Sequence, residues 1–273
     1  MSAQHVIIVV FENQNFDDMI GSPDMPYFNT LAQQKALATQ YYASTHPSIG
    51  NYFMLTAGTV LTNDGTFPGT FNADNVASRI AAAGKTWKMY AQSLPAVGYV
   101  GGDQYPYVKH HNPFAYYDNV INDPAQKRRI VPFSQFRADV DAGTLPNYSF
   151  VIPNEVNNGH DCPDGTDHMN CSLSARVGEI DNWLKNNFQS LIEDANFMKD
   201  TIVILTLDES ATDDTRGGGR IPTILMGAGI KTNFQSSNVY QHDSLLRFSL
   251  EAIGVNGAPG QGANAPGMGE FLQ

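Results

Sequence analysis

The stretch His5-Val-Ile-Ile-Val-Val-Phe11 decides the fold of this chain. It is a continuous apolar run rich in β-branched residues, which is typical of a strand buried on both faces of a parallel sheet. The run stops at Glu12-Asn13, a carboxylate beside an amide. Open α/β sheets gather ligands at the carboxyl ends of their strands, so this pair either contributes to a site or begins a solvated loop.

The rest of the chain alternates between strand-like and helix-like segments. Strands are expected over residues 36–42, 86–90, 147–152, 201–207 and 223–226, and helices over 26–33, 52–57, 75–83 and 173–192 and from 240 onward. This rhythm predicts an α/β fold with a mostly parallel sheet. Because no internal repeat or change of composition marks a boundary, residues 1–273 are expected to form one domain. It would carry an irregular, aromatic and His-rich insertion at about 93–135.

The composition and the N-terminal sequence argue against some partners and locations. The chain has 27 acidic and 16 basic residues and a formal charge of −11, which argues against a nucleic acid partner. No run approaches the roughly 18 apolar residues that a membrane span requires, so no stable membrane insertion is expected. The N-terminus has no basic segment followed by a signal core, and Met1-Ser-Ala-Gln4 would suit a mature chain whose leader is missing.

Cys162 and Cys171 enclose a short polar loop at residues 162–171. Neither lies in a C-x-x-C pair, so a disulfide is expected in preference to a zinc or redox motif. A disulfide in turn favours a periplasmic or secreted location.

The segment Ser44-Thr-His-Pro-Ser-Ile-Gly-Asn-Tyr52 places one hydroxyl, Ser48, just before an apolar helix. Ser48 is either the N-cap of that helix or a nucleophile. A second segment with two interpretations is Lys109-His-His-Asn-Pro113, whose histidines either contact a phosphate or metal or form a hydrogen-bonded surface turn.

Polar pairs at distant strand ends favour the nucleophile. They are Glu12-Asn13, His160-Asp161 and Asp208-Glu209. In a parallel sheet they converge on one edge, where their charges would repel each other unless a cation lay among them. Oxygen ligands suit Mg²⁺, Mn²⁺ or Ca²⁺, with Zn²⁺ as an alternative, so one divalent metal ion is expected beside Ser48. Such a site suits phosphate esters.

Six ordered motifs carry a resemblance to a known family. They are His5-Val-Ile-Ile-Val-Val-Phe-Glu-Asn13, Thr45-His-Pro-Ser-Ile-Gly-Asn-Tyr52, Lys109-His-His-Asn-Pro-Phe114, Asn158-Gly-His-Asp-Cys162, Leu207-Asp-Glu209 and His242-Asp-Ser-Leu-Leu-Arg247. Together they resemble the phosphoesterase family of bacterial and fungal acid phosphatases and phospholipases C, within the alkaline phosphatase superfamily. The resemblance is greatest to the acid phosphatase branch and implies a three-layer α/β/α sandwich.

The resemblance also implies roles for individual residues. The metal ligands would be Glu12, Asn13, Ser48, Asp208 and Glu209, with Ser48 also the nucleophile. Catalytic roles would fall to His111, His160 and His242, and substrate binding to the same three histidines with Asp161 and Asn51. His110 fits the family register less well than His111. The family often has Pro in place of Gly50 and Trp in place of Leu207.

The expected function is metal-dependent hydrolysis of phosphate monoesters, acid phosphatase-like, through a phosphoserine at Ser48, on a small-molecule ester. One alternative is a phospholipase C or another phosphodiesterase. An alternative of another class is a non-catalytic phosphate- or metal-binding protein. Hydrolysis of sulfate esters or phosphonates is a further alternative within the superfamily, and no oligomeric state follows from the sequence.

Overall fold

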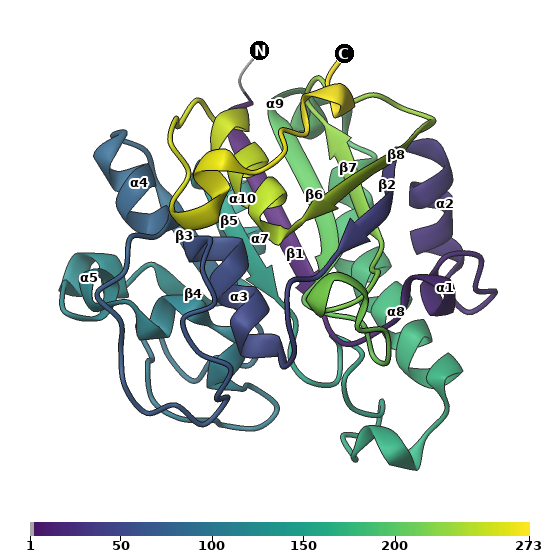
Figure 1. Cartoon of the computed structure of the whole chain (residues 1–273), viewed down its shortest axis with the longest axis horizontal. Coiled ribbons are helices and arrows are strands. Elements are labelled where there is room, and N and C mark those ends of the chain that lie inside the picture. Colours follow the sequence, from purple (N-terminus) through teal and green to yellow (C-terminus); the bar gives the residue numbers. More distant parts are fainter. Residues whose placement is uncertain (1–2) are drawn as a thin grey trace.

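A single eight-stranded sheet forms the centre of the computed structural model, which describes residues 3–273 (Figure 1). The strands lie in the order β4-β3-β5-β1-β6-β7-β2-β8. Their bounds are β1 His5–Phe11, β2 Ala36–Tyr42, β3 Trp87–Ala91, β4 Ile130–Pro132, β5 Tyr148–Ile152, β6 Thr201–Leu207, β7 Thr223–Gly227 and β8 Phe234–Gln241. Every neighbouring pair is parallel except those of β7, which runs antiparallel to β6 and β2. The predicted mostly parallel sheet is therefore confirmed.

Helices cover both faces of the sheet. They are α1 Phe16–Met19, α2 Pro26–Gln34, α3 Ser48–Ala57, α4 Val76–Ala82, α5 Asp118–Ile121, α6 Pro124–Lys127, α7 Ser134–Asp141, α8 Leu173–Ile192, α9 Ala195–Asp200 and α10 His242–Ala252. Phe150 of β5 packs on Tyr52 of α3, while Phe11 of β1 packs on Trp183 of α8. Since Phe150 pairs with Ile8, three residues before Phe11, these two aromatic contacts lie on opposite faces. The three-layer α/β/α sandwich is confirmed.

The first strand lies in the middle of the sheet, between β5 and β6. Residues 6–11 are completely buried, as expected for a continuous apolar run covered on both faces. Phe11 pairs in register with Leu207, the last residue of β6. The carboxylates that follow these two residues, Glu12 and Asp208, therefore leave the sheet side by side.

Several elements were not predicted from the sequence. The short β4, helix α7 and the edge strand β8 are absent from the expected elements, and the helix expected from Tyr240 begins at His242. Residues 93–135 are less irregular than expected, because they contain α5, α6, β4 and two 3₁₀ helices, Lys109–His111 and Pro113–Tyr116. The C-terminal tail does not run over the surface, since Met268 and Phe271 are buried in the core.

Two further predictions concern the covalent structure and the membrane. Cys162 and Cys171 form the expected disulfide, with their Cα atoms 5.8 Å apart. Within residues 3–273, no helix has both the length and the apolar character that crossing a membrane requires.

Candidate active site

The carboxylates at the ends of β1 and β6 are joined by Asn13. Its backbone N–H donates to Asp208 Oδ1 at 3.3 Å. In the amide orientation that satisfies both side-chain atoms, Nδ2 of Asn13 also donates to Glu12 Oε2 at 3.0 Å. Asn13 has a positive φ of 33°, a conformation that Asn adopts more readily than most residues. The structure therefore brings Glu12, Asn13 and Asp208 together as the sequence predicts.

Ser48 is the first residue of α3, and its hydroxyl points to the same carboxylates. Oγ donates to Glu12 Oε2 at 3.2 Å and to Glu209 Oε1 at 3.4 Å. Pro47 occupies the N-cap position, and no side chain caps the helix. The interpretation of Ser48 as an N-cap is therefore wrong. The uncapped end of α3 leaves the amides of Ser48 and Ile49 and the helix dipole available to an anion beside Ser48, while the Gly50 amide donates to the Pro47 carbonyl at 3.2 Å.

Asn51, predicted to bind substrate, lies one turn further along α3. Its Oδ1 accepts from the backbone N–H groups of Ser44 at 2.9 Å and Thr45 at 3.1 Å. Its Nδ2 donates to Glu209 Oε2 at 3.2 Å and to the Thr45 carbonyl at 2.7 Å. These bonds commit the amide to the loop before Ser48 and to Glu209, which differs from the predicted contact with substrate.

His111 lies between two buried carboxylates. Its Nε2 is 3.2 Å from Glu12 Oε1, and its Nδ1 is 2.9 Å from Glu155 Oε1. Tyr52 stacks on the imidazole with ring centroids 5.2 Å apart and donates its hydroxyl to Glu12 Oε1 at 2.5 Å. Among residues 3–273, no carboxylate forms an ion pair with the neighbouring His110, whereas His111 contacts two.

Three residues of this site are missing from the sequence-based set: His46, Tyr52 and Glu155. His46 Nδ1 lies 2.9 Å from Glu209 Oε2, so it contacts the cluster from the loop before Ser48. Glu155 follows the end of β5, the strand next to β1. The rule that identified Glu12 and Asp208 at strand ends could have identified Glu155 as well.

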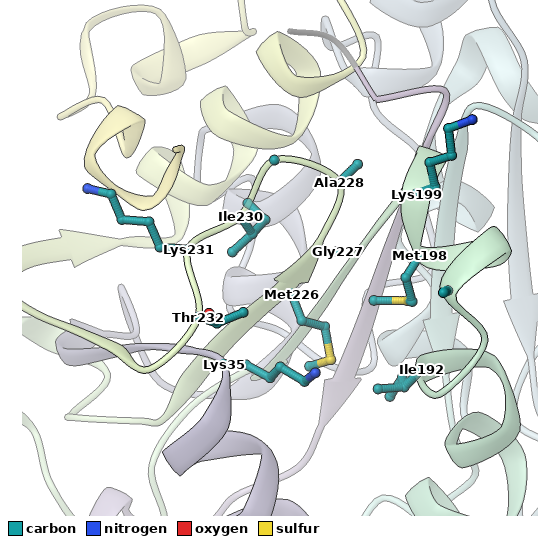
Figure 2. Close-up of a pocket in the computed structure, with 12 residues that line it drawn as sticks. Lys35, Ile192, Met198, Lys199, Met226, Gly227, Ala228, Ile230, Lys231 and Thr232 are labelled. Carbon is teal, nitrogen blue, oxygen red and sulfur yellow. The ribbon is translucent and has the colours of Figure 1, made fainter.

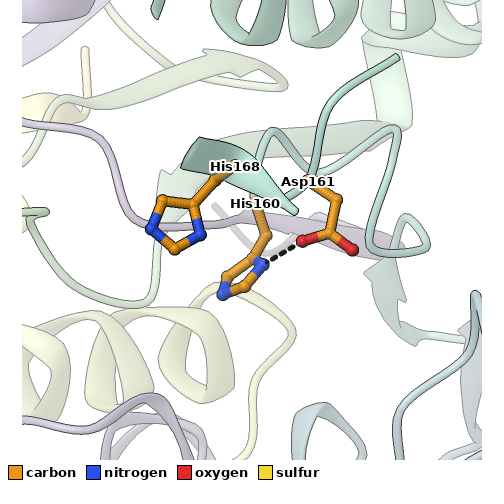
Figure 3. Close-up of side chains that lie close together, drawn as sticks. All are labelled: His160, Asp161 and His168. Carbon is orange, nitrogen blue, oxygen red and sulfur yellow. Dashed lines mark hydrogen bonds and ion pairs between the residues drawn. The ribbon is translucent and has the colours of Figure 1, made fainter. Parts of the chain in front are cut away.

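The loop after β5 carries His160 and Asp161 (Figure 3). Nδ1 of His160 is 2.8 Å from Asp161 Oδ1 and 3.3 Å from Glu155 Oε2, so this loop is connected to His111 through Glu155. His168 enters the same group from the disulfide loop, and the donor atoms of the three residues in Figure 3 lie within 4.8 Å of one another. His168 is a further residue of the cleft that the sequence patterns did not indicate.

His242 is the first residue of α10 and is completely buried. Its Nε2 lies 2.6 Å from the backbone carbonyl of Asp208, and its Nδ1 lies 3.0 Å from the Tyr41 hydroxyl. Both ring nitrogens therefore have protein partners, and neither contacts Ser48. The geometry makes His242 a support for the Asp208 backbone instead of the predicted contact with phosphate.

Burial and mutual repulsion dominate the electrostatics. Burial, followed by the charge of Asp208, raises the pKa of Glu12 well above its usual value and the pKa of Glu209 to about 9. Burial also raises the pKa of Asp208. Glu155 behaves differently, because the charge and hydrogen bond of His111 outweigh burial and lower its pKa to about 2.

The donor set fits a divalent cation. Among the described residues, the basic side chains that form ion-pair contacts with Glu12, Asp208 and Glu209 are histidines, namely His46 and His111. Three buried carboxyl groups with raised pKa values lack a compensating Lys or Arg, and a cation would supply that compensation. Carboxylate, amide and hydroxyl oxygens are the ligands that hard cations prefer.

A cleft opens beside this cluster. It has a volume of about 260 Å³ and is lined by Asn13, His160, His168, Arg176, Glu209, Ser210, Ala211 and Thr212. A different cavity of about 350 Å³ lies near the opposite edge of the sheet, where β2 and β6 begin (Figure 2). Its lysines Lys35, Lys199 and Lys231 point in different directions in Figure 2, so their charges do not converge on one point of the cavity. The cleft that borders the carboxylates is the one suited to a substrate.

Known structures share this architecture. A protein of the alkaline phosphatase superfamily from Vibrio parahaemolyticus superimposes with a TM-score of 0.63 at 18% identity, over 93% of this chain and 67% of that one. Murine ectonucleotide pyrophosphatase/phosphodiesterase 5 gives a TM-score of 0.62 at 12% identity, over 99% and 100%. At these identities the likeness concerns the fold alone, and it confirms the expected alkaline phosphatase-like architecture.

Sequence relatives define the family. A probable acid phosphatase of Kluyveromyces lactis is 30% identical over 257 residues, 90% of this chain and 56% of the relative. A phosphatidylinositol-3-phosphatase of Mycobacterium tuberculosis is 32% identical over 272 residues, 96% of this chain and 80% of the relative. The chain spans about half the length of the fungal acid phosphatases it matches. The sequence also matches the Phosphoesterase family over residues 22–256, which is most of its length, and the chain therefore belongs to that family.

Proposed function

We propose that this chain is a phosphoric ester hydrolase that cleaves phosphate monoesters through a phosphoserine on Ser48. The observation that carries the proposal is the position of Ser48 Oγ, which lies between Glu12 at 3.2 Å and Glu209 at 3.4 Å at the start of a helix. A buried hydroxyl between two carboxylates contributes little to the packing of the core, but its position suits a nucleophile. The acid phosphatase relatives support the reaction class.

A divalent cation belongs to this proposal. Its ligands would be Glu12, Asn13, Ser48, Asp208 and Glu209, the residues that the structure gathers at the ends of β1 and β6. When bound, a cation at these oxygens lowers the pKa of the serine hydroxyl and stabilises negative charge on the phosphoryl group. The metal could be Ca²⁺, Mg²⁺, Mn²⁺ or Zn²⁺, because all four accept oxygen ligands.

The residues of the chain then have separate roles in the reaction. As Ser48 Oγ attacks phosphorus, its proton passes to one of the carboxylates that accept its hydrogen bond, Glu12 or Glu209; the P–O bond to the alcohol breaks, and the leaving oxygen takes a proton. His160 suits the role of proton donor, because its side chain is 34% exposed in the cleft and is oriented by Asp161. The amides at the start of α3 stabilise the phosphoryl oxygens. Water then attacks the phosphoserine, which releases phosphate and restores the Ser48 hydroxyl.

His111 and His242 have supporting parts in this scheme. His111 holds Glu12 and Glu155 in place from within the core, and His242 fixes the Asp208 backbone. An exported location is part of the proposal and is supported by the disulfide Cys162–Cys171, since such bonds persist in oxidising compartments.

Replacement of the nucleophile tests the proposal. Ser48→Ala should lose nearly all hydrolysis of p-nitrophenyl phosphate while keeping the circular dichroism spectrum of the parent. A chelator should abolish activity, and added metal should restore it. Substantial turnover by Ser48→Ala would show that the hydroxyl is not the nucleophile.

A substrate panel separates the alternatives. Bis-p-nitrophenyl phosphate and phosphatidylcholine report a phosphodiesterase or a phospholipase C, and p-nitrophenyl sulfate and a phosphonate monoester report the other reactions of the superfamily. A chain that binds phosphate but turns over none of these would be a binding protein instead of an enzyme.

A further inference from the structure

The cleft beside the carboxylates contains a positive charge that the proposed reaction does not use. Arg176 projects from the first turn of α8 into the wall that also holds His160 and His168. It is the sole Lys or Arg among the residues that line this cleft. The cleft shares Asn13 and Glu209 with the carboxylate cluster, so a molecule with its phosphate at Ser48 can extend from the cluster into it.

Arg176 has few partners within the protein. Its Nη1 donates to the Gly159 carbonyl at a long 3.4 Å, and that carbonyl already accepts from Gln14 Nε2 at 2.9 Å. Its Nε is buried and has no hydrogen-bond partner in the described part of the chain. No carboxylate of residues 3–273 forms a direct ion pair with it, although Asp18 and Asp161 are close enough to act on it electrostatically. Other arginines do form such pairs: Arg79 with Asp74, Arg137 with Asp141 and Arg247 with Glu251.

A half-buried guanidinium without a direct ion pair is costly, because the charges of Asp18 and Asp161 act on Arg176 only from beyond contact distance. Burial lowers the pKa of Arg176, yet an arginine stays charged in proteins. An anion in the cleft would supply a direct partner, and a guanidinium binds carboxylate and phosphate through two parallel hydrogen bonds.

We infer that Arg176 binds a second anionic group of the substrate, a carboxylate or phosphate on the leaving alcohol. This inference rests on the proposed function, since it places the reacting phosphate at Ser48. The preferred substrates are thus phosphate monoesters whose alcohol carries a carboxylate or a second phosphate. Esters whose alcohol carries no charge, such as p-nitrophenyl phosphate, are poorer substrates. Arg176 is a specificity-determining residue in this scheme.

The test measures binding without turnover. Carboxyphenyl phosphonates, with the carboxylate in the ortho, meta or para position, are titrated into the metal-loaded protein by calorimetry. Carbamoylphenyl phosphonates of the same shape serve as neutral counterparts. For at least one isomer, the parent protein should bind the carboxylate about 10- to 100-fold more tightly, the range expected for a charge-assisted hydrogen-bonded pair.

Three variants assign the preference. Arg176→Met should remove it by weakening the carboxylate ligand alone, and Arg176→Lys should retain part of it. Lys185→Met removes one positive charge from the exposed side of the same helix and should leave the preference unchanged. This control separates a contact in the cleft from the general effect of net charge.

The outcomes are distinguishable. Equal affinity for both ligands in the parent, or a preference that survives in Arg176→Met, overturns the inference. So does an equal loss for both ligands, which would mean that Arg176 only supports the Gly159 loop or binds the reacting phosphate itself. Turnover of p-nitrophenyl phosphate is measured separately: turnover without a carboxylate preference refutes the inference alone. A preference without turnover of any ester refutes the proposed hydrolysis and leaves the anion site.

Discussion

The hydroxyl of Tyr52 should control how tightly the site holds its cation. Tyr52→Phe removes the oxygen that donates to Glu12 Oε1 at 2.5 Å. It keeps the ring that stacks on His111 and packs against Phe150. The change therefore affects one hydrogen bond to a proposed metal ligand and leaves the packing of the core intact.

The size of the effect follows from the environment of Glu12. This carboxyl is completely buried, and burial, Asp208 and Glu155 raise its pKa, while the hydrogen bond from Tyr52 opposes the rise. A hydrogen bond to a charged group contributes about 1.5–3 kcal/mol, which corresponds to a loss of about 10- to 150-fold in metal affinity. In other metalloproteins, removal of a residue that hydrogen-bonds to a metal ligand lowers metal affinity by about 10- to 100-fold, which agrees with this range.

The assay is competition for Mn²⁺ or Zn²⁺ with a fluorescent chelator, at fixed pH, for the parent and Tyr52→Phe. Tyr117→Phe is the matched control. Tyr117 is also buried, and its hydroxyl forms a 2.6 Å hydrogen bond with Oγ1 of Thr56, which lies on α3 as Tyr52 does. This control should lose about 1 kcal/mol of stability, because it loses a neutral hydrogen bond, and should keep the metal affinity of the parent.

Two results would refute the reasoning. Metal affinity of Tyr52→Phe equal to that of the parent would mean that Glu12 does not bind the cation or does not need Tyr52. An equal loss of affinity in Tyr117→Phe would mean that the effect reflects general destabilisation of α3.

Three other predictions concern stability. Cys162→Ser with Cys171→Ser opens a loop with a sequence separation of 9 and should lower the free energy of unfolding by about 2–3 kcal/mol, measured in urea. Burial, followed by the charge of His111, lowers the pKa of His110 to about 3, below its unfolded value of about 6.5. The neutral His110 therefore contributes stability above about pH 6.5, and this contribution is lost as the pH falls toward 3. His110→Gln should reduce the pH slope of unfolding there by at most about 1.4 kcal/mol per unit, and an unchanged slope would contradict this. Gly50→Ala should cost about 1–3 kcal/mol in urea and lower kcat, because its Cβ would lie 2.6 Å from Thr45 Cγ2 and 3.2 Å from Val60 Cγ1, in addition to the exposed Asn63 side chain, which can move aside. Parent-like values would show that these neighbours can also move.

The central part of the fold was predictable because its sequence signals are strong. The runs at β1 and β6 are apolar throughout, and both end abruptly in carboxylates. Once a parallel sheet is assumed, Glu12 and Asp208 must meet at one edge. Gly50 illustrates a detail that the sequence could not explain, since its departure from the family pattern makes sense only beside Asn63 and Thr45.

The rest depended on contacts that no periodicity encodes. Strand β8 reads FQSSNVYQ, a polar edge strand without a hydrophobic run, and its partner β2 lies far away in the sequence. Similarly, the side-chain direction of Asn51 is set by Ser44 and Glu209, and that of His242 by Tyr41 of β2 and the Asp208 carbonyl, all of them distant in sequence or outside any periodic pattern. Sequence patterns identified which residues reach the site, whereas tertiary packing decides which of them face a ligand.

The position of β1 also constrains how the chain is made. This strand is synthesised well before its two neighbours in the sheet, β5 and β6, and His5 pairs with Thr201 roughly 200 residues further on. At about 5–20 residues per second, that interval lasts about 10–40 s. Until β5 has been synthesised, the seven residues of β1 lack both of the strands that flank them in the sheet, and such an exposed apolar strand favours aggregation. The centre of the sheet can therefore close around β1 only after β5 and β6, the strands that flank it, have both been synthesised.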